Sequence, residues 1–171
     1  MSSFWKRWGR FATVAFVAVA IDQGTKLWAA SALKGKPDIE VISGFFNLHY
    51  TTNPAMMFSI GLTWPPALRT GLFLVLAILV MALIVYWQKK SAPTATRVQT
   101  TAFGIVMGGA LGNTIDRLYM NEVIDFLDVT NLPLIGRWPT FNVADIWIVV
   151  GAVLLIFTTG RKTETAKTKA A

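Results

Sequence analysis

Residues 98–117 read VQTTAFGIVMGGALGNTIDR and give the strongest single indication of the fold class. The run from Val98 to Ile115 contains 18 residues without a charge, bounded by Arg97 and Asp116. A helix needs about 20 predominantly apolar residues to cross the hydrocarbon core of a bilayer. This stretch therefore predicts a membrane-spanning helix.

The composition of the whole chain also indicates a membrane protein. Hydrophobic residues make up 54% of the 171 residues, and charged residues make up only 15%. A soluble domain usually carries about 25% charged residues, so this chain has too few to cover a water-facing surface. The same composition excludes an intrinsically disordered chain.

Three other segments complete the predicted bundle. Residues 70–88 form a second run without a charge, whereas the apolar segments near the two chain ends are interrupted or shortened by Asp22, Lys26 and Asp145. We expect a membrane all-α fold, a four-transmembrane-helix bundle with helices at about 10–32, 67–88, 98–117 and 141–160. Residues 1–160 then form a single integral membrane domain, and the polar residues 161–171 form a disordered cytoplasmic tail.

The first segment also fits a secretory signal peptide. Lys6, Arg7 and Arg10 precede an apolar run, and Ala18-Val19-Ala20 resembles a cleavage site with small residues. Three further predicted spans favour the other interpretation, in which this helix is retained in the protein.

The distribution of Lys and Arg predicts the orientation. With four spans, both termini and the connection 89–97 lie on one side, which carries ten of the 16 basic residues and a single acid, Glu164. An excess of basic residues marks the cytoplasmic side, so we expect both termini there. The net charge of +7 is thus a signal of topology, and we expect no nucleic-acid partner.

The longer connections fall on the outer side. In the connection 34–66, Ile39–Ile42 and Phe45–Tyr50 read as short strands around Ser43-Gly44, which predicts a small extramembrane β-structure. The second outer connection, residues 118–140, contains Asp125 between apolar neighbours. Such neighbours are a poor setting for a solvated carboxylate.

Polar residues within the predicted spans are functional candidates, because ionisable groups are costly in a membrane. They are Asp22 and Lys26 in the first helix, Asn113, Asp116 and Arg117 in the third, and Asn142 and Asp145 in the fourth. The topology places all of them near the outer interface, at the depth of Asp125. A transporter would need polar groups spread through the membrane, so a one-sided cluster argues against that class.

The spacing of these residues also allows a purely structural role. Asp22 precedes Lys26 by four residues, which permits an ion pair on one helix face, and Asp116 is adjacent to Arg117. Such pairs can serve only to hold helices together. Gly104, Gly108 and Gly112 recur at every fourth position of the third helix, where small residues let another helix approach closely.

Several kinds of chemistry are excluded by the residues present. The chain has no Cys and a single His, so a thiol nucleophile and a Cys-rich or His-rich metal site are ruled out. A Ser59–Lys26 pair, or His49 as a base, has no supporting spacing. Asp38 and Asp128 look like ordinary exposed acids.

Asp125 and Asp145 remain as two carboxylates in an apolar, interfacial setting. Two such groups close together share one proton, so one can take a proton from water while the other donates to a carbonyl. This is aspartic-protease chemistry, and it needs no cofactor. From the residues alone it is one use among others, since a membrane-assembly or binding protein could keep the same network for folding.

Five segments in order resemble the bacterial lipoprotein signal peptidase family, also called signal peptidase II. They are DQGTK at 22–26, Asn53, GGALGNTIDR at 108–117, VIDF at 123–126 and FNVAD at 141–145. The resemblance covers about residues 22–150, nearly everything but the tails. The GGALGNTIDR segment is its most specific part.

The resemblance implies an aspartic endopeptidase of the bacterial inner membrane, which cleaves diacylglyceryl-modified prolipoproteins before the lipid-modified cysteine at the outer face. Its two catalytic aspartates correspond to Asp125 and Asp145. Its supporting and substrate-binding residues correspond to Asp22, Lys26, Asn53, Asn113, Asp116, Arg117 and Asn142. Membrane lipids and globomycin-type peptide inhibitors are the other partners implied, and the match at Asp22 and Lys26 implies a retained first helix.

One segment departs from the family pattern. The family usually has a glycine two residues after the asparagine, whereas Asn53 is followed by Pro54-Ala55-Met56-Met57. Ala55 lacks the backbone freedom of glycine, and the paired Met residues add flexible apolar bulk. We expect a modified substrate-facing loop with altered substrate preference or inhibitor sensitivity.

Overall fold

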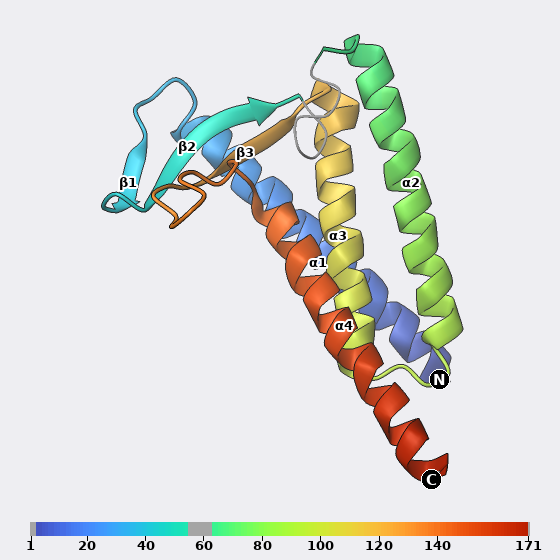
Figure 1. Ribbon diagram of the computed structural model, residues 1–171. Coiled ribbons are helices and arrows are strands. Elements are labelled where there is room, and N and C mark those ends of the chain that lie inside the picture. The colour runs from blue at the N-terminus through green and yellow to red at the C-terminus, as the bar shows by residue number, and fades with distance from the viewer. Residues whose placement is uncertain (1–2, 55–62, 171) are drawn as a thin grey trace.

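The chain folds into four helices and a small three-stranded sheet. The computed structural model describes residues 3–54 and 63–170, with side chains up to residue 158. The elements in chain order are α1 (Ser3–Ala32), β1 (Ile39–Ile42), β2 (Phe46–Asn53), α2 (Pro66–Ser91), α3 (Arg97–Met120), β3 (Val123–Val129) and α4 (Val143–Ala170). The sheet lies at one end of the helices, and the start of α1 and the end of α4 lie at the opposite end (Figure 1).

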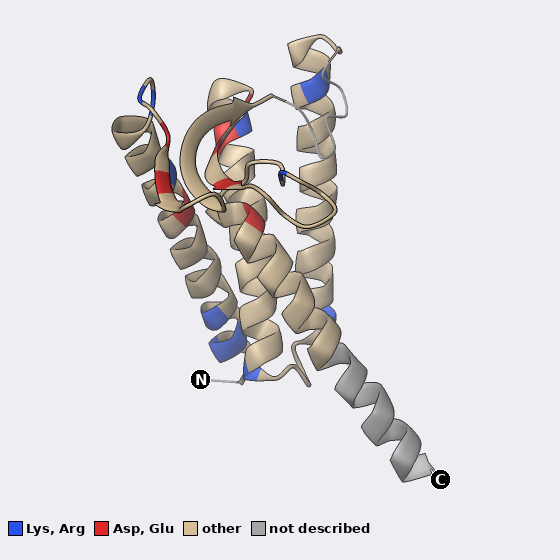
Figure 2. Cartoon of the chain, turned by 60° about the vertical axis from the view of Figure 1, so that its left-hand side comes forward, with Lys and Arg blue, Asp and Glu red and all other residues tan. Residues whose placement is uncertain are grey.

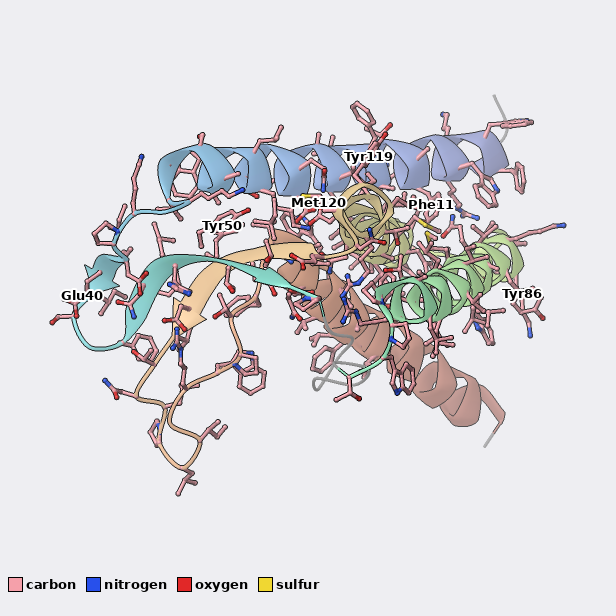
Figure 3. All side chains as sticks on the ribbon, turned by 90° about the horizontal axis from the view of Figure 1, so that it is seen from above. Phe11, Glu40, Tyr50, Tyr86, Tyr119 and Met120 are labelled. Carbon is pink, nitrogen blue, oxygen red and sulfur yellow. The ribbon has the colours of Figure 1, made fainter. Side chains whose placement is uncertain are left out.

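Helix α3 is the central helix of the bundle. It packs along α1 and α4 and less extensively along α2, whereas α2 and α4 make no extensive contact with each other among the described residues. Seen from the sheet end, α3 lies between α1 and the other two helices (Figure 3). Residues 98–117, whose sequence predicts a membrane-spanning helix, therefore belong to the helix on which the other helices pack.

Local chemistry accounts for the ends of the central helix. At its start, the Thr96 hydroxyl accepts a hydrogen bond of 3.1 Å from the Gln99 amide, which satisfies one of the amides that a helix start leaves unpaired. At its end, Asn121 adopts a left-handed conformation with φ 60° and donates its amide to the Arg117 carbonyl. The chain thus turns from α3 into β3 directly after Met120.

The sheet has the strand order β1-β2-β3, and both pairs are antiparallel. The strands predicted at Ile39–Ile42 and Phe45–Tyr50 are confirmed as β1 and β2. Tyr50 of β2 points towards α1 (Figure 3), where β2 and β3 pack on the end of that helix around Ala29 and Leu33.

Strand β3 corrects the expectation that residues 118–140 form only a connection. Asp125 is a strand residue, paired in register with Thr51 of β2. A strand is predicted from a sequence when apolar and polar residues alternate, which happens when one face is buried and the other is exposed. The first four residues of β3 are all buried, because this strand is covered on both faces. The sequence VIDFLDV therefore shows no alternation.

The predicted helices are confirmed with shifted ends. Helix α4 continues to Ala170, so its predicted end near residue 160 is wrong, and a helix occupies most of the expected disordered tail. The physical reason is that Lys, Glu and Ala in this segment are good helix formers even without an apolar face. The division of the chain into a membrane domain and a tail stays a prediction.

Hydropathy and charge follow the long axis of the molecule. Within the described residues, α2 is the helix long and apolar enough to cross a membrane by length and composition, and the apolar part of α4, Val143–Thr158, is shorter. The acidic residues coloured in Figure 2 lie in the half that carries the sheet, together with some Lys and Arg, while the opposite helix ends carry only Lys and Arg among the coloured residues. Helices α1 and α3 are less apolar than α2 because they carry buried polar residues in their sheet-side halves.

The glycine stripe of α3 lets α1 approach closely, as the spacing predicts. A Cβ atom at Gly104 would lie 2.9 Å from the Phe11 carbonyl oxygen, and one at Gly108 would lie 2.8 Å from the Ala15 carbonyl oxygen. The neighbours are backbone atoms, which cannot rotate away. Gly109 is similarly close to α4, where a Cβ atom would lie 2.5 Å from the Ala144 carbonyl oxygen.

Replacing Gly108 by Ala should destabilise the bundle, because the added methyl group must separate α1 from α3. We expect a loss of about 1–3 kcal/mol, the usual cost of overpacking, measured by thermal unfolding in detergent. Gly71→Ala on α2 is the matched control, since a Cβ atom there would meet no atom of another described element within 4 Å. Equal melting temperatures for the two variants would contradict the packing argument.

Candidate active site

The sheet-side end of the bundle is organised around one buried lysine. The Lys26 side chain is 2% exposed, and its Nζ lies 2.9 Å from Asp22 Oδ2 and 2.9 Å from Asp116 Oδ2. The same ammonium donates a third bond of 2.9 Å to Asn113 Oδ1. An ammonium group has three N–H donors, so all of them are used. The predicted Asp22–Lys26 pair is confirmed within α1, and the bonds from Lys26 to Asp116 and Asn113 join α1 to α3.

Asp22 carries this connection on to α4. Its Oδ1 accepts a hydrogen bond of 2.9 Å from the Ala144 amide in the first turn of α4, where a helix has unpaired amides and a positive end. Gln23, the next residue of α1, donates to the Asp22 carboxylate at 3.2 Å. It also reaches α3, where it donates to the Gly112 carbonyl at 3.2 Å and to Asp116 Oδ1 at 2.9 Å. Asp22, Gln23 and Lys26 of α1 thus tie α1 to both α3 and α4.

Asn142 and Asp145 form a reciprocal cap at the start of α4. The backbone N–H of Asn142 donates to Asp145 Oδ2, and the backbone N–H of Asp145 donates to Asn142 Oδ1, both at 3.1 Å. This arrangement uses the Asn-x-x-Asp spacing visible in the sequence. It holds the Asp145 carboxylate, which is half-buried, in a single orientation.

The Asn142 side chain also reaches the other candidate aspartate. Its Nδ2 donates to Asp125 Oδ1 at 2.7 Å and to Asn113 Oδ1 at 3.1 Å. Asn113 in turn donates its Nδ2 to Asp145 Oδ1 at 2.9 Å. The carboxylates of Asp125 and Asp145 are therefore linked through two shared asparagines, although they come from a strand and a helix.

Asp125 lies in a low-dielectric setting at 3% exposure. Burial, together with the negative charge of Asp145, raises the pKa of this carboxyl to about 7, while hydrogen bonds from Asn53 and Asn142 act in the opposite direction. The Asn53 bond runs from Nδ2 to Asp125 Oδ2 at 3.1 Å and comes from the end of β2. Near neutral pH this carboxyl can hold or release a proton.

Arg117 closes the site on the side of α2. Its guanidinium carbon lies 3.8 Å from the centre of the Phe73 ring, and its Nη1 donates to the Asn113 carbonyl oxygen at 3.4 Å. The charges of Asp125, Asp145 and Asp116 all act on this guanidinium. Arg117 thus adds a second cation, besides Lys26, to this end of the bundle.

The structure brings all nine residues of the predicted site into one connected network. The contacts above join Asp22, Lys26, Asn53, Asn113, Asp116, Arg117, Asp125, Asn142 and Asp145. The residues come from α1, α3, β3, the start of α4 and the end of β2. What each residue does in a reaction is taken up as a proposal below.

The family model for signal peptidase II matches residues 14–160, which is most of the chain. The chain belongs to the signal peptidase II family. The lipoprotein signal peptidase of Psychromonas ingrahamii is 39% identical over 150 residues, covering 86% of this chain and 83% of that protein. The lipoprotein signal peptidase of Aeromonas hydrophila subsp. hydrophila is 37% identical over 151 residues, covering 88% of this chain and 86% of that protein.

A solved structure supports the same assignment. A bacterial membrane enzyme with 28% sequence identity superposes with a TM-score of 0.75 and covers 92% of this chain and 91% of that one. The signal peptidase II chain described here is therefore a bacterial membrane protease with a mostly helical fold and a small sheet.

Some residues of the signal peptidase II site were not predicted from the sequence. The sequence alone assigns no role to Gln23 or Phe73. For Gln23 the signal was present, since it is polar, lies beside Asp22 and sits inside a predicted span. Phe73 gave no signal, because one more apolar residue in an apolar helix is not informative.

Asp128 corrects an expectation, because it is not an exposed acid. It is 1% exposed, and its carboxylate accepts a bond of 2.8 Å from Arg137 Nε. Asp38 is half exposed, as expected, and its Oδ1 lies 2.6 Å from His49 Nδ1. That pair contains the only histidine of the chain, and it is not connected to the network around Lys26 by any contact among the described residues.

Two other expectations concern residues that the structure does not cover. The divergent Ala55-Met56-Met57 segment and Ser59 lie outside the described residues.

In the part of the chain that is described, no group of three or more His, Cys, Asp or Glu side chains could hold a metal ion.

Lys26→Met should strongly destabilise the protein. The substitution removes one buried cation and leaves the Asp22 and Asp116 carboxylates, at 0% and 3% exposure, without their partner. Breaking a buried ion pair from one side costs about 3–5 kcal/mol. Thermal unfolding in detergent measures the loss, and Lys36→Met, at an exposed position, is the control. A loss below about 1 kcal/mol would mean that the triad contributes little.

Asp125 should make stability fall as the pH rises. Its pKa is about 7 in the folded protein against an ordinary value of 3.8, so between these pH values the folded state binds more protons than the unfolded state. Asp125→Asn removes this titration, and its melting temperature relative to the parent should increase from pH 5 to pH 8. A constant difference across this range would show that the carboxyl does not titrate with a raised pKa.

Proposed function

We propose that this signal peptidase II is an aspartic endopeptidase, with Asp125 and Asp145 as its catalytic pair. It removes the signal peptide from diacylglyceryl-modified prolipoproteins and cuts before the lipid-modified cysteine. Family membership supports removal of signal peptides from prolipoproteins. The observation that carries the aspartic mechanism is the linkage of two carboxylates through the side chains of Asn142 and Asn113 and the backbone amide of Asn142.

The proposed pair holds one proton between its two members. With a pKa of about 7, Asp125 remains largely protonated at the pH where an ordinary carboxyl is ionised. Asp145 is only half-buried, and it accepts hydrogen bonds at both of its oxygens, from the Asn113 side chain and from the backbone amide of Asn142. The two environments therefore separate an acid from a base.

Hydrolysis follows from these two states. The Asp145 carboxylate takes a proton from water as the water oxygen attacks the scissile carbonyl carbon, and Asp125 donates its proton to the carbonyl oxygen. As the C–N bond breaks, Asp145 gives its proton to the nitrogen of the cysteine, and Asp125 takes a proton back from a hydroxyl of the tetrahedral diol, which becomes the new carboxyl group. The pair thus returns to one shared proton. No covalent intermediate with the enzyme forms, and no cofactor takes part.

The surrounding residues serve as positioning groups. Asn142 and Asn113 fix the orientation of both carboxylates, and Asn53 fixes Asp125 from the end of β2. Lys26 and Asp22 hold α1, α3 and α4 in the register that brings these asparagines together. Such support is needed because a catalytic group displaced by about 1 Å loses much of its effect.

We propose a bacterial inner-membrane location, with four spans, both termini in the cytoplasm and the sheet on the outer face. At the end opposite the sheet, the charged residues coloured in Figure 2 are all Lys or Arg, which supports this orientation. Many large apolar side chains on α2 are exposed, including Leu68, Ile78 and Leu79 at 57–60%. These are suitable contacts for membrane lipids.

The substrate enters from the side, within the membrane. Because α2 and α4 make no extensive contact among the described residues, an apolar signal helix and its lipid chains can approach Asp145 between them. Globomycin-type peptides are proposed inhibitors that occupy the same approach. The Pro54–Met57 segment follows Asn53 directly in the chain, so its unusual sequence is expected to alter these affinities.

Asp125→Asn and Asp145→Asn should each abolish proteolysis. Removing either the acid or the base costs at least about 100-fold in rate, measured as release of the signal peptide from a diacylglyceryl-modified prolipoprotein in detergent or lipid. Asp38→Asn, at a half-exposed position outside the network, should cleave at the parental rate. Thermal melts verify that each variant is folded. Full activity of a folded Asp145→Asn would disprove the pair.

The same assay separates the enzymatic proposal from a purely structural network. If the aspartates only hold the helices together, the variants lose stability and the parent releases no peptide. Cleavage by the parent with no cleavage by either folded variant supports the aspartic pair.

A further inference from the structure

Arg69 is a buried cation that the proposed mechanism does not use. It lies in the first turn of α2 at 9% exposure, and its Nε is buried without a hydrogen-bond partner in the part of the chain that is described. The ion pairs among the described residues do not include it. A buried charge normally requires an opposite charge and hydrogen bonds, so this position is unusual.

The position of Arg69 directs it to the active site. Arg69 and Phe73 are four residues apart on one face of α2, and the Phe73 ring lies against the Arg117 guanidinium. Arg69 therefore lies one helical turn before the ring that contacts Arg117. Arg117 in turn donates to the carbonyl oxygen of Asn113, whose side chain binds Asp145. Arg69 and Arg117 thus lie on either side of Phe73, at the end of the bundle that carries the candidate catalytic pair.

The start of α2 increases the positive potential at this point. A helix start carries unpaired amides and a partial positive charge, and the first turn of α2 contains no acidic residue that would offset it. A cation placed at this end of a helix is unfavourable unless an anion is bound there. The 26-residue helix, Arg69 and Arg117 together make a site for an anionic group.

The proposed reaction creates such a group at this place. Hydrolysis adds water across the scissile bond, so the water oxygen becomes part of a new carboxyl group on the signal peptide and the amine stays on the lipid-modified cysteine. At neutral pH the carboxyl loses its proton and the amine gains one. The new carboxylate arises next to Asp125 and Asp145, which repel it, whereas Arg117 beside Phe73 and Arg69 one turn earlier on α2 supply positive charge at this end of the bundle.

We propose that Arg69 binds the newly formed C-terminal carboxylate of the cleaved signal peptide, together with Arg117. The inference rests on the proposed function, since it assigns a partner to a product of that reaction. Arg69 is a product-binding residue in this scheme. A guanidinium suits the task because its planar donors can hold both oxygens of a carboxylate.

The alternative ligand for Arg69 is a backbone carbonyl of the uncleaved substrate. A carbonyl is neutral, whereas the product carboxylate carries a full charge, so the two ligands can be separated with peptides. A signal peptide with a free C-terminal acid carries the charge, and the same peptide with a C-terminal amide keeps a carbonyl oxygen without it.

The experiment measures binding of these two peptides to the full-length protein in detergent. The probe is the fluorescently labelled signal peptide released from the prolipoprotein substrate, as free acid and as amide, and the readout is fluorescence anisotropy. The parent should bind the acid at least about tenfold more tightly than the amide, as expected for a hydrogen-bonded charge pair. In Arg69→Gln, the ratio of the dissociation constants of the amide and the acid should fall below about threefold, since one of the two cations is lost.

Two further variants support the interpretation. Arg97→Gln, at an exposed position at the start of α3, should keep the parental ratio because it lies at the opposite end of the bundle from Arg69. Arg69→Lys keeps the charge without the planar fork, so its ratio should fall between those of the parent and Arg69→Gln. It also provides a test if Arg69→Gln does not fold.

The outcomes distinguish this inference from the proposed function. Cleavage by the parent together with equal binding of acid and amide would overturn the role of Arg69 and leave the proteolytic function intact. The role of Arg69 would also be overturned if Arg69→Gln or Arg69→Lys bound the acid in preference to the amide by the same ratio as the parent. Absence of cleavage by the parent in the same preparation would instead count against the proposed function.

Discussion

The three bonds of the Lys26 ammonium are the constraint on which the rest of this structure depends. They join the carboxylates of Asp22 and Asp116 and the amide of Asn113 in a region that is almost fully buried. A lysine in such a place is tolerated only because every donor has a partner, and the partners come from two helices. Since Asp22 also accepts a bond from the first turn of α4, the relative position of three helices is defined at the depth of the proposed catalytic pair.

Close packing of the helices makes this polar network possible. The glycine stripe of α3 removes side chains where α1 passes, so that Asp22 can approach the α3 backbone at Gly112. Without the hydrophobic effect as a driving force between helices in lipid, association depends on such close contact and on interhelical hydrogen bonds. The stripe and the network are therefore parts of one solution, in which small residues bring the polar ones within bonding distance.

The sheet contributes what the helices cannot. Asp145 belongs to α4, but Asp125 reaches the same place because β3 runs from the end of α3 across the bundle and is paired with β2. The end of β2 carries Asn53, which holds the second oxygen of Asp125. Two carboxyl groups from different kinds of element thus meet different surroundings, and burial together with the neighbouring charge moves the pKa of Asp125 to about 7.

The sequence by itself determined the helices, the first two strands, the identity of the polar residues and the family. Uncharged runs, helical spacing and strings such as GGALGNTIDR are local properties, so each can be read without knowing which segments touch. Only the tertiary structure decided that Asp125 is a strand residue, that Asp116 pairs with Lys26, that Asp128 is buried, and that Arg117 lies against Phe73. These facts depend on burial and on contacts between distant segments, and neither follows from the order of residues along the chain.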